Sequence, residues 1–107
     1  MNRVSFSLNI ANLIVHMNLD GLHPAIDYVK RSTEEQQRMF EKGASKLDGV
    51  HKLSAHQSGM AADILLFTDD GKLMTEWPKE ISEKYHQTWV LWGGKPVITW
   101  DVGHFEA

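Results

Sequence analysis

Two histidines and two aspartates occur at spacings that could build a metal-dependent hydrolase site. His56 precedes Asp63 by seven residues, and Asp101 precedes His104 by three. Asp63 lies inside a short apolar run, where burying a bare carboxylate is costly unless it is paired or bound to a cation. The small residues between His56 and Asp63 would let the histidine fold back over the strand end toward this carboxylate. These two residues would form half of a metal site.

The other half would come from the C-terminal stretch. Residues three apart on a regular strand face opposite sides, but Gly103 permits a kink or bulge that would bring Asp101 and His104 toward one cavity. If this stretch lies beside the strand of Asp63, then His56, Asp63 and His104 converge. Two imidazoles and one carboxylate suit Zn²⁺ with a fourth position left to water, as in catalytic zinc sites. Asp101 would then be placed to take a proton from this water and pass it to a leaving amine.

The elements that must position these residues follow from apolar spacing and turn signals. Apolar side chains recur at helical spacing from Phe6 to Met17, which predicts a helix capped by Ser5 or Ser7 rather than an export signal. Asp69-Asp70-Gly71 has the chemistry of a hairpin turn. The other expected elements are strands at 25–30, 62–67, 72–75 and 97–100, a helix at 33–42, and a helix that begins near Pro78 and ends near Gly93. This order predicts a small α+β domain spanning residues 1–107, with an antiparallel sheet covered by helices.

Composition excludes several classes of function. The chain has 107 residues, fewer than the roughly 150 usual for a domain, so we expect one domain. Its 11 basic and 14 acidic residues give a net charge of −3, which argues against binding to nucleic acid or to an anionic membrane. The absence of cysteine excludes disulfides, thiolate metal sites and a cysteine nucleophile. No apolar run approaches the roughly 20 residues that span a bilayer, so we expect no membrane insertion.

The remaining histidines and the tryptophans have more ordinary expected roles. We expect His16, His23, His51 and His86 to face solvent, with His51 as the best spare ligand. Tryptophans are more often core residues than platforms for a ligand. Trp92 and Trp100, which lie near the expected pocket in the sequence, are the exceptions that we would expect at a binding surface.

Three blocks of sequence, in order, resemble the M15 zinc peptidases. They are Arg31-Ser32-Thr33-Glu34-Glu35-Gln36, then Ser54-x-His56-x₆-Asp63, then Asp101-x-x-His104-Phe105-Glu106. The family includes D-Ala-D-Ala carboxypeptidases, dipeptidases and phage endolysins of the L-alanyl-D-glutamate peptidase type. Trp92-Gly93-Gly94 and the ending in His-Phe-Glu are most similar to those endolysins. The resemblance covers about Tyr28 to Glu106, most of the chain.

The resemblance implies a zinc site at the sheet face and names its residues. His56, Asp63 and His104 would hold one Zn²⁺, and Asp101 would be the catalytic base. Arg31, a permanent forked cation, would anchor a substrate carboxylate or stabilise a developing oxyanion. The residues expected to contact substrate are Arg31, Gln36, Ser54 and Trp92.

The same resemblance implies the substrate and the place of action. The substrate would be the stem peptide of bacterial peptidoglycan, cut between L-alanine and D-glutamate. We expect a phage lysis protein, made in the cytoplasm without a signal peptide, that reaches the cell wall after the membrane is permeabilised. No partner subunit is implied, and a monomer is the simpler expectation.

Other interpretations stay open at this point. Taken alone, His56 could be a loop residue and Asp63 a strand-end cap, while Gln36 could simply cap a helix at Thr33. Ser54 could initiate a turn, and Arg31 could pair with a nearby glutamate on the surface. At the level of function, the alternatives are a D-Ala-D-Ala carboxypeptidase or dipeptidase, a non-catalytic peptidoglycan-binding module, and a metal site that only stabilises a small fold. The last of these would need four protein ligands, and the sequence offers three.

Overall fold

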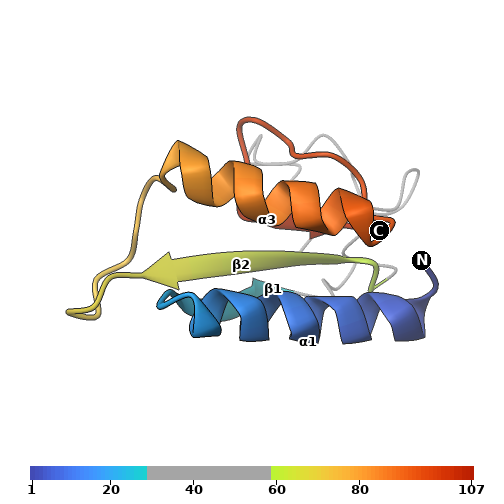
Figure 1. Ribbon diagram of the computed structural model, residues 1–107, viewed down its shortest axis with the longest axis horizontal. Coiled ribbons are helices and arrows are strands. Elements are labelled where there is room, and N and C mark those ends of the chain that lie inside the picture. Colours follow the sequence, from blue (N-terminus) through green and yellow to red (C-terminus); the bar gives the residue numbers. More distant parts are fainter. Residues whose placement is uncertain (29–58) are drawn as a thin grey trace, which may run out of the picture.

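A three-stranded antiparallel sheet and two helices make up the part of the chain that the computed structural model describes, residues 1–28 and 59–107 (Figure 1). In chain order the elements are α1 (Arg3–Leu19), β1 (His23–Tyr28), β2 (Ala61–Phe67), α3 (Lys79–Leu91) and β3 (His104–Glu106). The strand order is β1-β2-β3, with β2 in the middle. The predicted α+β class with an antiparallel sheet is therefore confirmed. The expected helix at 33–42 lies outside the described residues.

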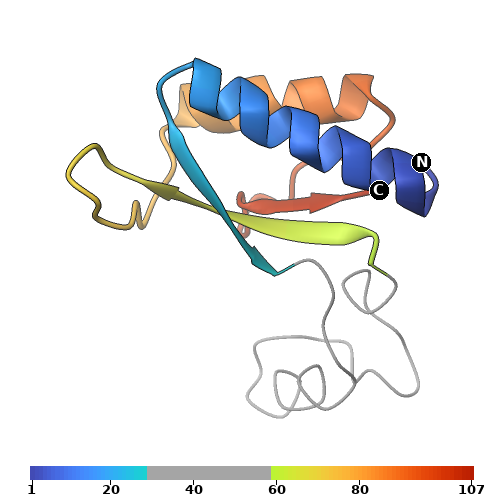
Figure 2. The same ribbon diagram turned by 90° about the horizontal axis from the view of Figure 1, so that it is seen from below.

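Both helices lie on the same side of the sheet (Figure 2), and the core forms between them and β2. Alternate residues of β2 face this core, so Ala62, Ile64 and Leu66 are buried. The helices and β3 contribute its other large side chains: Phe6, Leu13, Met17, Trp89 and Phe105. Because the side chains of a strand alternate between its two faces, Asp63 points to the face of the sheet that the helices leave open.

The first helix begins earlier than its apolar spacing predicts. Asn2 is the N-cap: its side chain accepts a hydrogen bond from the Ser5 amide at 2.8 Å, and the Ser5 hydroxyl accepts one from the Asn2 amide at 3.0 Å. The expectation that Ser5 or Ser7 caps the helix is wrong, because reciprocal bonding with Asn2 makes Ser5 the third helical residue. No helix within 1–28 or 59–107 is long and apolar enough to cross a membrane.

The predicted strand at 97–100 is also wrong. Residues 94–103 form neither helix nor strand, and the third strand is instead His104–Glu106. The β-branched and aromatic residues of 97–100 suggested a strand, but β-propensity is realised only where a partner strand is available. That partner, the start of β2, pairs with residues 104–106.

The predicted turn at Asp69-Asp70-Gly71 is present, but the expected strand at 72–75 is reduced to a single bridge between Phe67 and Leu73.

Trp89 connects α3 to β3. Its indole nitrogen donates a hydrogen bond to the Glu106 carbonyl at 2.8 Å, and its ring packs edge-on against Phe105. Gly94 passes so close to this ring that a Cβ there would lie 2.1 Å from the indole nitrogen. A glycine at this position lets the chain leave α3 directly over Trp89. The helix therefore fixes where β3, and the histidine at its start, lies against β2.

Candidate metal centre

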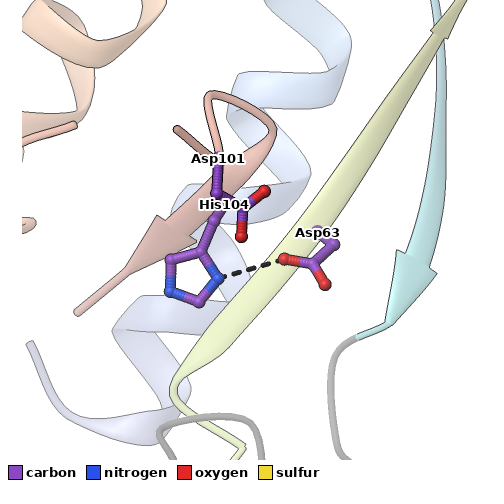
Figure 3. A group of neighbouring side chains, drawn as sticks. All are labelled: Asp63, Asp101 and His104. Atoms are coloured by element: carbon purple, nitrogen blue, oxygen red, sulfur yellow. Dashed lines mark hydrogen bonds and ion pairs between the residues drawn. The ribbon is translucent and has the colours of Figure 1, made fainter. Parts of the chain in front are cut away.

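The pairing of β2 with β3 places Asp63 directly opposite His104. The two residues are cross-strand partners in the antiparallel register. Their side chains meet on the open face of the sheet, with His104 Nδ1 3.0 Å from Asp63 Oδ1 (Figure 3). The side chain of His104 is 10% exposed and that of Asp63 is 22% exposed. This contact brings together two of the three metal ligands that the sequence predicts.

A tight turn before β3 adds Asp101 to the pair. The His104 amide donates to the Asp101 carbonyl at 3.1 Å, and the Ile64 amide of β2 donates to the Gly103 carbonyl at 2.8 Å. A Cβ on residue 103 would lie 2.6 Å from the Ile64 carbonyl oxygen, so only glycine allows the turn to approach β2 this closely. The predicted role of Gly103 in bringing Asp101 and His104 together is confirmed. Ligand atoms of Asp63, Asp101 and His104 all lie within 4.8 Å of one another.

The charges around His104 favour a cation. Burial of the imidazole ring disfavours its protonated form, yet the pKa of His104 is raised above its ordinary value. The largest opposing effects are the hydrogen bond that the ring donates to Asp63 and the charge of that carboxylate, followed by contributions from Glu106 and Asp101. An imidazole whose pKa is raised in spite of burial lies in a negative potential. A divalent cation would be stabilised by the same potential and would displace the proton.

The spacing of the donor atoms fits a shared zinc ion. Zinc bound at about 2.0–2.1 Å to nitrogen and oxygen ligands in a tetrahedron places those ligands roughly 3.4 Å apart. The distance of 3.0 Å between His104 Nδ1 and Asp63 Oδ1 needs to widen by only a few tenths of an ångström to reach this value. An imidazole nitrogen with carboxylate oxygens is also a donor set that zinc uses. The residues present therefore fit the ion.

Glu106 contacts the other nitrogen of the same imidazole ring. Its Oε1 lies 3.4 Å from His104 Nε2, and its Oε2 lies 3.2 Å from Lys95 Nζ. Ligating histidines typically direct their second nitrogen to a carboxylate, which fixes the ring orientation and the tautomer. Residues 104 and 106 are two positions apart in β3, so their side chains lie on the same face of the sheet. This spacing is visible in the sequence. In the sequence Glu106 belongs to the block that resembles the M15 peptidases but has no predicted role of its own.

A groove of about 460 Å³ runs along the open face beside these residues. Its lining combines carboxylates with apolar side chains: Asp27, Asp63, Leu73, Met74, Trp77, Trp100 and Asp101. Trp100 is 80% exposed and lines this groove, and its place at a binding surface stays a prediction. Asp27 lies where the register of β1 against β2 shifts. Bulges of this kind re-aim side chains next to functional sites, and nothing in the sequence marked this one.

Most of the other predicted site residues fall on positions that the structure does not describe. His56, Arg31, Gln36 and Ser54 lie outside the described residues, as does the spare ligand His51. Trp92 ends α3 and packs near the His16 ring of α1, with 5.7 Å between ring centroids. It is not among the residues that line the groove.

One histidine that was expected to face solvent does not. His86 of α3 is only 4% exposed, so this expectation is wrong. The residue is three positions before Trp89 and therefore shares its face of the helix, toward the core. His16 and His23 are exposed, as expected, and His23 Nε2 lies 2.8 Å from Asp69 Oδ1.

A scan of the chain against protein-family models finds no match.

Proposed function

We propose that this protein is a zinc-dependent peptidase that hydrolyses the stem peptide of bacterial peptidoglycan, at the bond between L-alanine and D-glutamate. The observation that carries the proposal is the convergence of Asp63, Asp101 and His104, from two strands and a turn, within 4.8 Å. These are three of the five residues that the M15 resemblance assigns to metal binding and catalysis, the others being His56 and Arg31. A purely structural role for Asp63 does not explain why Asp101 should be brought to the same place.

The proposal divides the roles between the converging residues. Asp63 and His104 hold the ion together with His56, and Glu106 holds the His104 ring in place. When bound, zinc would polarise the scissile carbonyl and acidify a water molecule. Asp101 accepts the proton of the attacking water and returns it to the departing amine, the task of a general base that becomes a general acid. Its carboxylate lies within reach of both ligands, as this task requires.

The groove beside the triad supports a peptide substrate. Its lining includes the exposed Trp100 and the carboxylate of Asp27. An extended peptide in such a groove would pass its carbonyl groups over Asp63 and Asp101. The choice of peptidoglycan, and of a lysis protein that acts on the wall after release from the cytoplasm, rests on the M15 resemblance.

Digestion of defined muropeptides with Asp101→Asn tests the proposal. The wild-type protein should release fragments with a new N-terminal D-glutamate in the presence of zinc, and a chelator should abolish this release. Asp101→Asn should bind zinc but lose hydrolysis, because an amide cannot accept the proton. Asp69→Asn, which changes an exposed carboxylate on the distal turn, serves as the matched control and should remain active.

Each other outcome contradicts a particular part of the proposal. Unchanged turnover in Asp101→Asn refutes the role of Asp101 as the base. Release of D-alanine instead identifies a D-Ala-D-Ala carboxypeptidase. Retention on insoluble peptidoglycan without any fragment release identifies a binding module. Negligible zinc in the folded protein after expression with added zinc refutes the metal site.

A further inference from the structure

The buried histidine of α3 takes no part in the steps proposed above. His86 is 4% exposed, and its Nε2 lies 2.6 Å from the Val102 carbonyl oxygen. A carbonyl oxygen only accepts hydrogen bonds, so Nε2 carries the hydrogen and donates it. The other nitrogen, Nδ1, is buried and has no hydrogen-bond partner among residues 1–28 and 59–107. A buried polar atom without a partner is costly, so the other contacts of this ring must offset that cost.

The ring of His86 holds the chain on both sides of His104. Val102, whose carbonyl it binds, comes directly after Asp101 and two residues before His104. Phe105, the residue after His104, stacks on the same ring, with centroids 4.2 Å apart and planes inclined by 4°. One side chain of α3 therefore fixes the backbone before His104 and the side chain after it. Both contacts limit where Asp101 and His104 can lie relative to β2.

This turn needs an external anchor because it has little regular structure of its own. Residues 94–103 lack helix and strand, and the turn contacts β2 through the Ile64 amide. A phenylalanine at position 86 could stack on Phe105 but could not donate to Val102. A glutamine could donate but could not stack in the same way. Histidine in the Nε2–H tautomer does both, which gives a physical reason for this residue type.

We propose that His86 is a positioning residue that sets the separation of Asp101 and His104 from Asp63. Its importance for catalysis rests on the proposed peptidase function, but its effect on the turn does not. The prediction for the turn can therefore be tested without metal or substrate.

The first test compares His86→Phe with a core variant, Leu13→Ala, by amide hydrogen exchange in the metal-free protein. Leu13 is fully buried in α1, so its truncation lowers stability through a cavity without touching the turn. We expect His86→Phe to reduce the protection of the Ile64 and His104 amides about tenfold relative to the Ile10 amide of α1. Leu13→Ala should leave that ratio unchanged. Equal ratios in the two variants would overturn the proposal.

The second test measures zinc affinity by competition with a chelator. Residues that orient metal ligands typically contribute 10- to 100-fold to affinity, so we expect His86→Phe to bind zinc at least about tenfold more weakly than the wild type and Leu13→Ala. His86→Gln, which keeps a donor for Val102, should recover part of this loss. Affinity in His86→Phe equal to that of Leu13→Ala contradicts the proposal. If the wild type binds no zinc, the metal site fails while the exchange result still decides the role of His86.

A third measurement needs no variant and covers the case in which His86→Phe does not fold. The ¹⁵N chemical shifts of the His86 ring in the wild type should show the Nε2–H tautomer. The Nδ1–H tautomer would remove the bond to Val102 and refute the proposal.

Discussion

Replacing Gly103 with alanine should disable the candidate metal centre far more than it destabilises the fold. The added Cβ would lie 2.6 Å from the Ile64 carbonyl oxygen, whereas real Cβ contacts stay above 3.0 Å. The turn must therefore move away from β2 by at least 0.4 Å, the difference between these two values. That movement stretches the hydrogen bond from the Ile64 amide to the Gly103 carbonyl from 2.8 Å to about 3.2 Å, the edge of a normal bond.

This movement should lower both the free energy of unfolding and the affinity of the candidate site for zinc. Overpacking of this kind costs about 1–3 kcal/mol, and in a domain of this size each kcal/mol lowers the melting temperature by roughly 4–8 °C. Asp101 and His104 move with the turn, away from Asp63. Loss of the contacts that hold metal ligands in place typically lowers the affinity for the metal by about 10- to 100-fold. We expect thermal unfolding and zinc titration to show both effects in Gly103→Ala.

Gly21→Ala is the matched control for this variant. Gly21 has a φ of 88° and nothing within 4 Å of an added Cβ. Alanine there costs about 1–2 kcal/mol because the left-handed conformation is strained, a loss similar to that expected for Gly103→Ala. Gly21 precedes β1 at the end of the sheet where His23 pairs with Phe67, away from Asp63. Equal zinc affinities in the two variants would refute the argument that close approach of the turn builds the site.

Two further predictions concern the groups around His104. Glu106→Gln should weaken zinc binding about tenfold in a calorimetric titration, because a neutral amide is a poorer acceptor for the His104 ring; wild-type affinity would show that Glu106 does not orient the ring. Burial, as the largest cause, lowers the pKa of His86 below its ordinary 6.5, so the unfolded chain takes up protons more readily as the pH falls through this value. The stability that neutral His86 contributes should thus be present above pH 6.5 and lost as the pH falls through the lower folded-state pKa. Denaturant unfolding should show the advantage of the wild type over His86→Phe shrinking in acid, and a difference that grows in acid would contradict the assignment.

Several elements could be predicted because their signals are local. The apolar spacing of α1, the apolar run of β2 and the turn at Asp69-Asp70-Gly71 each depend on neighbouring residues alone. A carboxylate inside an apolar strand is likewise a local signal, and it distinguishes Asp63 without knowledge of its partner. These features are present in the structure, and the observed boundaries of the helix and the strand differ from the expected ones by up to three residues.

The errors share one cause, which is that pairing and burial are decided by distant segments. The residues of 97–100 have high β-propensity, yet β2 pairs with 104–106, because Trp89 and His86 hold that segment against the core. His86 was expected at the surface because a histidine is polar, and only the packing of Phe105 on its ring shows why it is buried.

For the candidate site, the sequence alone determined the residue types and the glycine that lets them approach one another. It could not determine that Asp63 and His104, which are 41 residues apart in the sequence, would be direct cross-strand partners, since register depends on how two distant strands meet. Nor could it determine that Asp27 would lie at a bulge, or that α3 would anchor the turn through Val102. Spacing along the chain limits which side chains can act together, but the distances that chemistry needs are decided by non-local packing.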